Sequence, residues 1–273
     1  MLAFGIAAGA AIVLFLLWLC LAAPGRRRPE TAALARVRYA HRGLHDAAAG
    51  IPENSLAAFA RAIERGYGIE LDVQLSSDGI PIVFHDETLD RVCGRAGRVS
   101  SMTAAELTAV PLGGGEHCIP TLAEALRLVD GRVPLLVEIK YYRAPKAIAA
   151  AAAALLDAYR GDYCIESFHP LAVAWFRHNR PSVVRGQLAM NYLKKKPDRR
   201  RRPYDLALHL FLTNFLGRPD FIAYDLHDRR ALTFRIFSKI FHPTLFGWTA
   251  RCQQDLTTDG FDTFILECKG DSL

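Results

Sequence analysis

The segment Ile69-Glu70-Leu71-Asp72-Val73 decides the fold class of this chain. In an extended strand, alternation places Glu70 and Asp72 on one face and the three apolar residues on the other. The stretch Leu-Leu-Val-Glu-Ile-Lys at 135–140 repeats the pattern, with Glu138 on the charged face. In a closed parallel barrel the apolar face would pack against helices, and the charged face would point inward. The inward carboxylates would repel one another and would need a cation or protons to remain there.

Short apolar runs alternate with helical patterns along the rest of the chain, which is typical of β-α units around a parallel sheet. The strand candidates are 37–40, 69–73, 82–84, 135–140, 163–168, 184–188, 221–224, 245–250 and 262–266. The link at 76–79 is too short for a parallel crossover, and its Asp-Gly favours a tight turn, so residues 82–84 are predicted to form a hairpin. Eight parallel strands remain. We therefore predict an α/β fold, a TIM-like (β/α)8 barrel with a β-hairpin after its second strand.

Helix signals lie between these strand candidates. Asn54 or Ser55 can cap a helix after the first strand. Thr121 and Glu124 form a capping box, and Pro145 opens an Ala-rich helix.

The composition is that of a folded protein with a large core. The chain has 273 residues, 51% of them apolar, and a formal net charge of +6. These values exclude a disordered or collagen-like chain. The length allows two average domains, but one α/β barrel also uses about 250 residues. No zinc-finger spacing or aromatic RNA-binding motif accompanies the basic residues, so we expect no nucleic-acid partner.

The N-terminal segment 2–23 carries no charged residue. About 20 apolar residues span a bilayer, so we predict a transmembrane helix within 1–25 that anchors the chain in the membrane. A cleaved signal peptide is the alternative, although no basic residue precedes the apolar run. Arginines follow it at 26–28, and the positive-inside rule then predicts a single-pass membrane protein with its catalytic domain in the cytoplasm. The predicted domains are this anchor at 1–25, a basic linker at 26–36 and a barrel domain at 37–273.

The inward carboxylates Glu70, Asp72 and Glu138 would converge at one barrel mouth. Carboxylate oxygens are hard ligands, so three of them favour one divalent cation, Mg²⁺ or Ca²⁺, over zinc. An internal salt bridge is the alternative for any single pair, because buried ion pairs also occur without function.

Two histidines and two cations flank these acids. His41 closes the first strand candidate, and His85 closes the hairpin. Phosphodiester displacement needs a base or nucleophile on one side and an acid for the leaving alkoxide on the other, and histidine titrates near neutrality. Arg42 can bind a phosphate oxygen in a bidentate manner, and Lys140 supplies a second positive charge. For either histidine alone, a structural hydrogen-bonding role is the alternative.

These residues belong to a longer series of motifs. The series comprises His41-Arg42-Gly43, Pro52-Glu53-Asn54-Ser55, residues 69–73, Asp78-Gly79, His85-Asp86 with Leu89 and Arg91, Ile119-Pro120-Thr121-Leu122, Glu138-Ile139-Lys140, Ser167-Phe168 and Trp248-Thr249. In order and spacing it resembles the glycerophosphodiester phosphodiesterase family over about residues 38–267. The resemblance implies a TIM-like barrel enzyme, a phosphoric diester hydrolase that releases an alcohol and glycerol 3-phosphate in glycerophospholipid metabolism.

The resemblance also implies roles for single residues. Glu70, Asp72 and Glu138 match the family's metal ligands. His41 and His85 match its catalytic pair. Arg42 and Lys140 match the residues with which the family contacts the phosphate. Trp248 and Phe168 are candidates for the walls of the substrate pocket, with packing as the alternative. The final Leu266-Glu267 departs from the family's Thr-Asp, so no role follows for Glu267.

Two other functions stay open at this point. A lysophospholipase D-type phosphodiesterase acting on lysophospholipids is favoured by the anchor and the apolar segments. A catalytically silent barrel that binds phospholipid would retain the fold without turnover.

The segment 194–216 also has two interpretations. Seven basic residues lie within 194–202, and an apolar stretch follows at 204–216. Such a face can contact anionic lipid at a membrane. Alternatively, the basic residues form a solvated loop, and the apolar stretch forms ordinary barrel helices.

Overall fold

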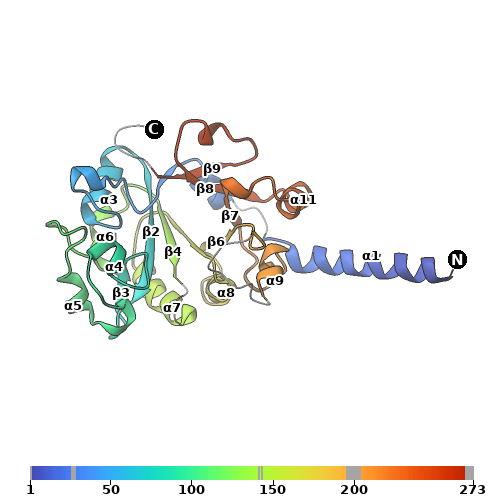
Figure 1. The fold of residues 1–273 in the computed structure, drawn as a ribbon, viewed down its shortest axis with the longest axis horizontal. Coiled ribbons are helices and arrows are strands. Elements are labelled where there is room, and N and C mark those ends of the chain that lie inside the picture. Colours follow the sequence, from blue (N-terminus) through green and yellow to red (C-terminus); the bar gives the residue numbers. More distant parts are fainter. Residues whose placement is uncertain (1, 26–28, 141, 143, 195–203, 268–273) are drawn as a thin grey trace.

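A computed structural model describes the chain except for residues 1, 26–28, 141, 143, 195–203 and 268–273 (Figure 1). The strands are β1 (Tyr39–Ala40), β2 (Gly68–Leu75), β3 (Pro81–Val83), β4 (Leu135–Ile139), β5 (Tyr163–Ser167), β6 (Val184–Ala189), β7 (Phe221–Asp225), β8 (Thr244–Ala250) and β9 (Thr263–Leu266). The helices are α1 (Leu2–Ala22), α2 (Pro29–Leu34), α3 (Leu56–Glu64), α4 (Asp90–Cys93), α5 (Ala104–Thr108), α6 (Leu122–Val129), α7 (Pro145–Leu156), α8 (Pro170–Asn179), α9 (Asp205–His209), α10 (Asn214–Gly217) and α11 (Leu232–Phe241). Short 3₁₀ turns lie at Ala47–Ala49, Val99–Ser101, Leu226–Asp228 and Asp255–Thr257.

The described strands form a closed parallel barrel with one antiparallel addition. Neighbouring strands follow the order β1-β9-β8-β7-β6-β5-β4-β2-β3, and the pairing of β1 with β2 closes the ring. β3 alone runs antiparallel to its neighbour, with Val83 opposite Val73 of β2. The eight-stranded barrel and the hairpin after its second strand are therefore confirmed.

Side-chain caps determine where the barrel helices begin. Ser55 accepts a hydrogen bond from the Ala58 amide at the start of α3. Thr121 and Glu124 form the predicted capping box of α6, and Pro145 lies in the first turn of α7, a position where its missing N–H costs nothing. Short caps of this kind fix the loops that carry the polar residues of the barrel mouth.

The two faces of the strands differ as their alternation predicts. Leu71 and Val137 are fully buried in the core between the strands and the surrounding helices. A second cluster contains Tyr39, Phe221 and Phe246, and the rings of Phe221 and Phe246 stack with centroids 4.2 Å apart. Tyr39 begins β1 and Phe221 begins β7, so this aromatic cluster fills the amino-terminal part of the barrel interior. Polar side chains can then occupy the interior at the carboxyl ends of the strands.

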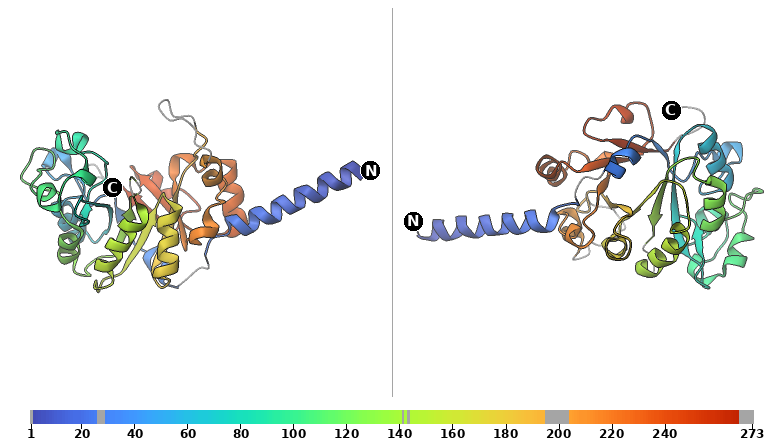
Figure 2. Two further views of the ribbon diagram at one scale, coloured as in Figure 1. Left: turned by 90° about the horizontal axis from the view of Figure 1, so that it is seen from below. Right: turned by 180° about the vertical axis from the view of Figure 1, so that it is seen from behind.

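Helix α1 projects from the barrel, and only its C-terminal end packs against the domain (Figures 1 and 2). The Trp18 indole N–H donates a hydrogen bond to the Leu210 carbonyl, 3.0 Å away. The Asn214 amide donates to the Ala22 carbonyl at 2.8 Å, and the Arg218 guanidinium donates to two further carbonyls at this end of the helix. Side chains of the domain therefore satisfy the carbonyls that the end of a helix leaves unpaired.

The predicted membrane span is wrong. Within the part of the chain that the structure describes, no helix is long and apolar enough to cross a membrane. The last turn of α1 instead packs on the domain through Trp18 and Ala22. The predictions of a transmembrane helix and of a single-pass membrane protein are corrected accordingly.

Most of the basic run at 194–202 lies outside the described residues. Lys194 forms an ion pair with Asp228, with Nζ and Oδ1 2.9 Å apart. The apolar stretch that follows forms α9 and α10, and Leu208 and Phe211 are buried in a core cluster with Phe237 of α11. The described part of the segment thus has the arrangement of ordinary barrel helices that bury one face.

Candidate active site

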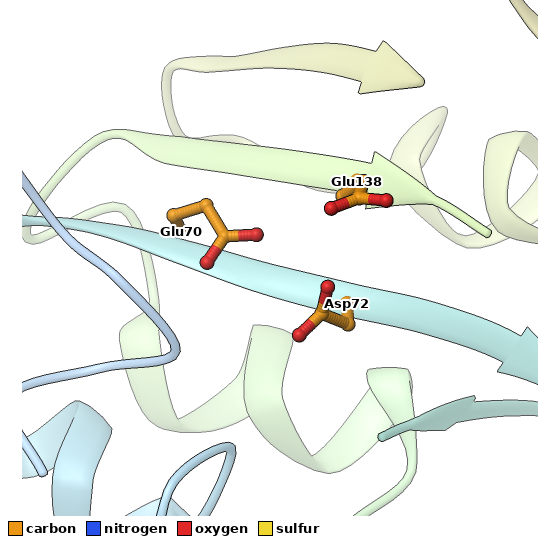
Figure 3. Close-up of side chains that lie close together, drawn as sticks. All are labelled: Glu70, Asp72 and Glu138. Carbon is orange, nitrogen blue, oxygen red and sulfur yellow. The ribbon is translucent and has the colours of Figure 1, made fainter. Parts of the chain in front are cut away.

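Three acidic side chains from the neighbouring strands β2 and β4 lie close together (Figure 3). Glu70 and Asp72 come from β2, and Glu138 comes from β4, where it lies opposite Asp72 in the strand register. One carboxylate oxygen from each residue lies within 4.8 Å of the others, and all three side chains are buried. The structure therefore brings together the three acids that alternation placed on one face.

Lys140 balances part of this negative charge. Its Nζ lies 2.8 Å from Asp72 Oδ1 and 2.8 Å from Glu138 Oε1. Burial tends to raise the pKa of Asp72, but the charges of Lys140, His85 and Arg42 hold that pKa well below its ordinary value. An ammonium can donate three hydrogen bonds, and among the described residues the Lys140 ammonium contacts these two carboxylates.

Positive neighbours compensate Glu70 and Glu138 less completely than Asp72. Burial and the neighbouring Asp72 and Glu138 raise the pKa of Glu70 well above its ordinary value. Burial raises the pKa of Glu138 to about 7, although Lys140 opposes the shift. Three buried carboxylates with so little compensation form a set of oxygen donors that fits a divalent cation such as Mg²⁺ or Ca²⁺.

The sequence analysis missed a fourth acid in this region. Glu166 of β5 lies beside Glu138 in the register, is buried, and its Oε2 has no hydrogen-bond partner among the described residues. Burial, and then the charge of Glu70, raise its pKa well above its ordinary value. The signal was present, because Cys164 and Glu166 alternate with Ile165 in the same way as the acids of β2 alternate with apolar residues.

The two histidines lie at the ends of β1 and of the β2–β3 hairpin. The His41 amide donates to the Leu266 carbonyl at 2.8 Å. Its side-chain Nδ1 is buried and has no hydrogen-bond partner among the described residues. Nδ1 of His85 lies 2.5 Å from Asp86 Oδ1. Burial, and then the charge of Arg42, lower the pKa of His41 well below its ordinary value, and His85 adds to this effect. Burial also lowers the pKa of His85.

Arg42 reaches the acids with its backbone as well as its side chain. Its φ of 57° turns its amide toward Glu70, whose Oε2 accepts a hydrogen bond at 2.8 Å. Its guanidinium bonds Glu53 at 2.6 Å and lies 3.4 Å from Asp72. Gly43 follows with φ 78°, and a Cβ there would lie 2.8 Å from the Cβ of Ala58, so the tight turn requires glycine.

Asn54 is a second residue whose role the sequence analysis missed. The side-chain amide of Asn54 donates a 2.7 Å hydrogen bond to Asp72 Oδ2, and its backbone amide donates to the Arg42 carbonyl at 2.9 Å. It therefore joins the loop after β1 to the acidic cluster. Asn54 belongs to one of the sequence motifs, but its hydrogen bond to Asp72, 18 residues further along the chain, could not be predicted from the sequence.

Two aromatic rings flank the interior cluster of the barrel. Phe168 and Trp248 pack edge to face with centroids 5.5 Å apart. Both residues are partly buried and pack against a core cluster, which agrees with the packing role that was the alternative for them.

Comparisons with known proteins connect this geometry to a family. Residues 41–224 match the model of the Glycerophosphoryl diester phosphodiesterase family. The glycerophosphodiester phosphodiesterase of Caldanaerobacter subterraneus subsp. tengcongensis is 44% identical over 110 residues, which are 37% of this chain and 44% of that protein. The glycerophosphodiester phosphodiesterase of Bacillus altitudinis is 32% identical over 176 residues, which are 59% of this chain and 69% of that protein. The first alignment thus spans less than half of that relative's length.

A solved structure shares the fold. A phosphodiesterase of Oleispira antarctica, in complex with the product sn-glycerol-3-phosphate, has a TM-score of 0.66 and 22% identity, and the match covers 84% of this chain and 92% of that one. At this identity the likeness concerns the fold alone. The family match, in contrast, spans His41, His85 and all three clustered acids. Because it covers most of the chain, this protein belongs to the glycerophosphoryl diester phosphodiesterase family.

Proposed function

We propose that this chain hydrolyses glycerophosphodiesters to an alcohol and glycerol 3-phosphate with the help of one divalent cation. The observation that carries the proposal is the buried cluster of Glu70, Asp72 and Glu138 beside two histidines in a barrel of this family. A binding protein without turnover would have no need to bury three acidic side chains together, because such an arrangement costs stability.

The three clustered acids would hold the cation, as their oxygen donors fit Mg²⁺ or Ca²⁺. When bound, such a cation neutralises charge on the phosphoryl oxygens. Arg42 adds a guanidinium that can bind a phosphate oxygen, and the Lys140 ammonium supplies a second donor. Together these groups stabilise the negative charge that grows during the displacement.

His41 and His85 would divide the two proton transfers. Burial lowers the pKa of both rings, so both are neutral at pH 7 in the protein without metal. One ring, as the neutral imidazole, would take a proton from the attacking group. The other ring would give a proton to the leaving alkoxide, so it must carry that proton when the negatively charged phosphodiester is bound. The Phe168–Trp248 pair would wall the pocket on the side of the substrate's carbon chain.

The test is turnover by the full chain, stripped of metal and then supplied with Mg²⁺ or Ca²⁺. Glycerophosphocholine is offered beside lysophosphatidylcholine. We expect metal-restored release of glycerol 3-phosphate, lost by at least 100-fold in Glu70→Gln and His41→Asn. Asp157→Asn, which alters an exposed carboxylate paired with Arg180, is the matched control and should retain full activity.

Each outcome of this assay has a defined meaning. A preference for the lysophospholipid would establish the lysophospholipase D-type alternative in place of glycerophosphodiester hydrolysis. Turnover that survives chelation, or that survives Glu70→Gln, would refute the role given to the acidic cluster. Absence of turnover on both substrates with both metals would refute the proposed activity.

A further inference from the structure

A chain of ion pairs runs across the barrel mouth from His85 to Arg42. Asp86 Oδ1 lies 2.5 Å from His85 Nδ1, and its other oxygen accepts a 2.5 Å hydrogen bond from Arg91 Nε. The two terminal nitrogens of Arg91 bond the two oxygens of Glu53 at 2.9 and 2.6 Å. Glu53 Oε1 in turn accepts a 2.6 Å hydrogen bond from Arg42.

We infer that Arg91 is a positioning residue that holds His85 and Arg42 in one fixed relation through Asp86 and Glu53. The inference rests on the proposed roles of His85 and Arg42. Arg91 itself is half exposed. Among the residues that the structure describes, it forms ion pairs with Glu53 and Asp86 and not with the three clustered acids, so it acts through these two carboxylates.

Hydrogen bonds fix the main chain around His85, but they do not fix the orientation of its side chain. The amide of the buried Gln74, on β2, donates 2.7 Å hydrogen bonds to the carbonyls of Phe84 and Asp86. These bonds fix the main chain on both sides of His85, but they leave its ring free to turn about the side-chain bonds. The bond from Asp86 to Nδ1 removes that freedom, and Arg91 holds the Asp86 carboxylate in the orientation that makes this bond.

The second arm reaches Arg42 through Glu53. Burial tends to raise the pKa of Glu53, but hydrogen bonds from Arg91 and the charge of Arg42 lower it to about 2. Glu53 is therefore an anion across the neutral range, shared between two guanidinium groups. Without Arg91, the Glu53 carboxylate would lose a bidentate partner and could turn, and the Arg42 side chain would follow it away from the phosphate position.

The geometry requires arginine at position 91. A guanidinium presents its N–H groups in a rigid planar fork, so one edge can serve Asp86 while the terminal nitrogens serve both oxygens of Glu53. A lysine carries the same charge at a single point and cannot hold two carboxylates in fixed orientations. Arg91→Lys therefore separates the effect of the fork from the effect of the charge.

The experiment measures kcat and KM for glycerophosphocholine with saturating metal in a set of single and double variants. Asp86→Asn should lower mainly kcat, because it releases the His85 ring. Glu53→Gln should raise mainly KM, because it releases Arg42. We expect Arg91→Gln to do both, with kcat/KM reduced by about 10- to 100-fold, the loss that misplacement of about 1 Å can produce. Arg91→Lys should recover less than half of this loss on a logarithmic scale.

The control is Arg98→Gln. Arg98 is exposed to a similar degree and forms an ion pair with Glu87, outside the chain of contacts described above. Thermal unfolding midpoints of Arg91→Gln, Arg91→Lys and Arg98→Gln should agree within about 3 °C. A double variant, Arg91→Gln with Asp86→Asn, should lose less kcat than the two single changes would predict if they were independent, because contacting residues couple.

Two results would overturn the inference. If Arg91→Gln behaves like Arg98→Gln, or if Arg91→Lys restores full activity, then Arg91 does not position His85 and Arg42 through its fork. His85→Asn and Arg42→Gln provide the separate check on the underlying roles. If these two variants keep the wild-type kcat and KM, the proposed site itself is refuted. If their kcat/KM falls while that of Arg91→Gln does not, only the positioning role of Arg91 is refuted.

Discussion

Removal of the Lys140 ammonium should destabilise the metal-free protein strongly. In Lys140→Met, the two 2.8 Å contacts to Asp72 and Glu138 disappear while both carboxylates stay buried. Breaking a buried pair by removing one partner costs about 3–5 kcal/mol, because an uncompensated charge is left behind. That is a large part of the roughly 5–15 kcal/mol by which a folded domain is stable.

Urea unfolding at pH 7 with a chelator present measures this effect. With a urea dependence of about 3 kcal/mol per M, the midpoint should fall by about 1–2 M. Arg180→Met removes a half-exposed ion pair with Asp157 and should change the free energy of unfolding by less than about 1 kcal/mol. Addition of Mg²⁺ or Ca²⁺ should recover part of the loss in Lys140→Met, since a ligand that binds only the folded state stabilises it. An equal midpoint in both variants would refute the argument from uncompensated charge, and the absence of any metal effect would refute the proposed cation site.

Three further predictions concern single positions. In the metal-free protein the pKa of Glu138 is about 7, against 4.5 in the unfolded chain. Between these two pH values the folded state keeps the proton that the unfolded state loses, so the free energy of unfolding falls as the pH rises from 4.5 to 7. Glu138→Gln should remove roughly 3 kcal/mol of that fall, measured by urea unfolding at pH 4.5 and 7.5. Gly43→Ala should lower the free energy of unfolding by at least about 2 kcal/mol, because Gly43 has a positive φ and close neighbours. Gly50 has a similar φ but open space around it, so Gly50→Ala should lower the free energy of unfolding by about 1 kcal/mol. Equal losses in the two variants would contradict the steric argument. Trp248→Ala should raise KM for glycerophosphocholine about 10-fold with kcat within a factor of 3, and an unchanged KM would assign this ring to packing alone.

The barrel was predictable from sequence because its signals are local. Alternation along residues 69–73 and 135–139 reports which face of each strand is apolar, and both strands lie in the barrel as that alternation requires. The hairpin was predictable for a similar reason, since a link of five residues, 76–80, leaves few ways to connect two strands. The membrane span failed because the apolar run does not reveal that Trp18 and Ala22 pack on a domain nearly 200 residues further along the chain.

The acidic cluster was predictable to the extent that strand register was. Glu138 and Asp72 lie side by side because adjacent parallel strands place their carboxyl ends at the same rim. The ion pairs across the mouth were not predictable, although Glu53 and Arg91 belong to recognisable motifs. Whether two side chains 38 residues apart meet depends on loop paths and rotamers, which composition and periodicity do not encode.

The junction between α1 and the barrel has a mechanical consequence. The carbonyls at the end of α1 are held by Asn214 and Arg218, and Trp18 rests against Phe241 with ring centroids 5.6 Å apart. A helix that ends on glycine can swivel about that residue, but this one is clamped by two side chains from α10 and its C-cap and by an aromatic contact with α11. These contacts hold the helix at one angle to the barrel, so a partner that binds the projecting part of α1 would also set the direction in which the mouth of the barrel faces.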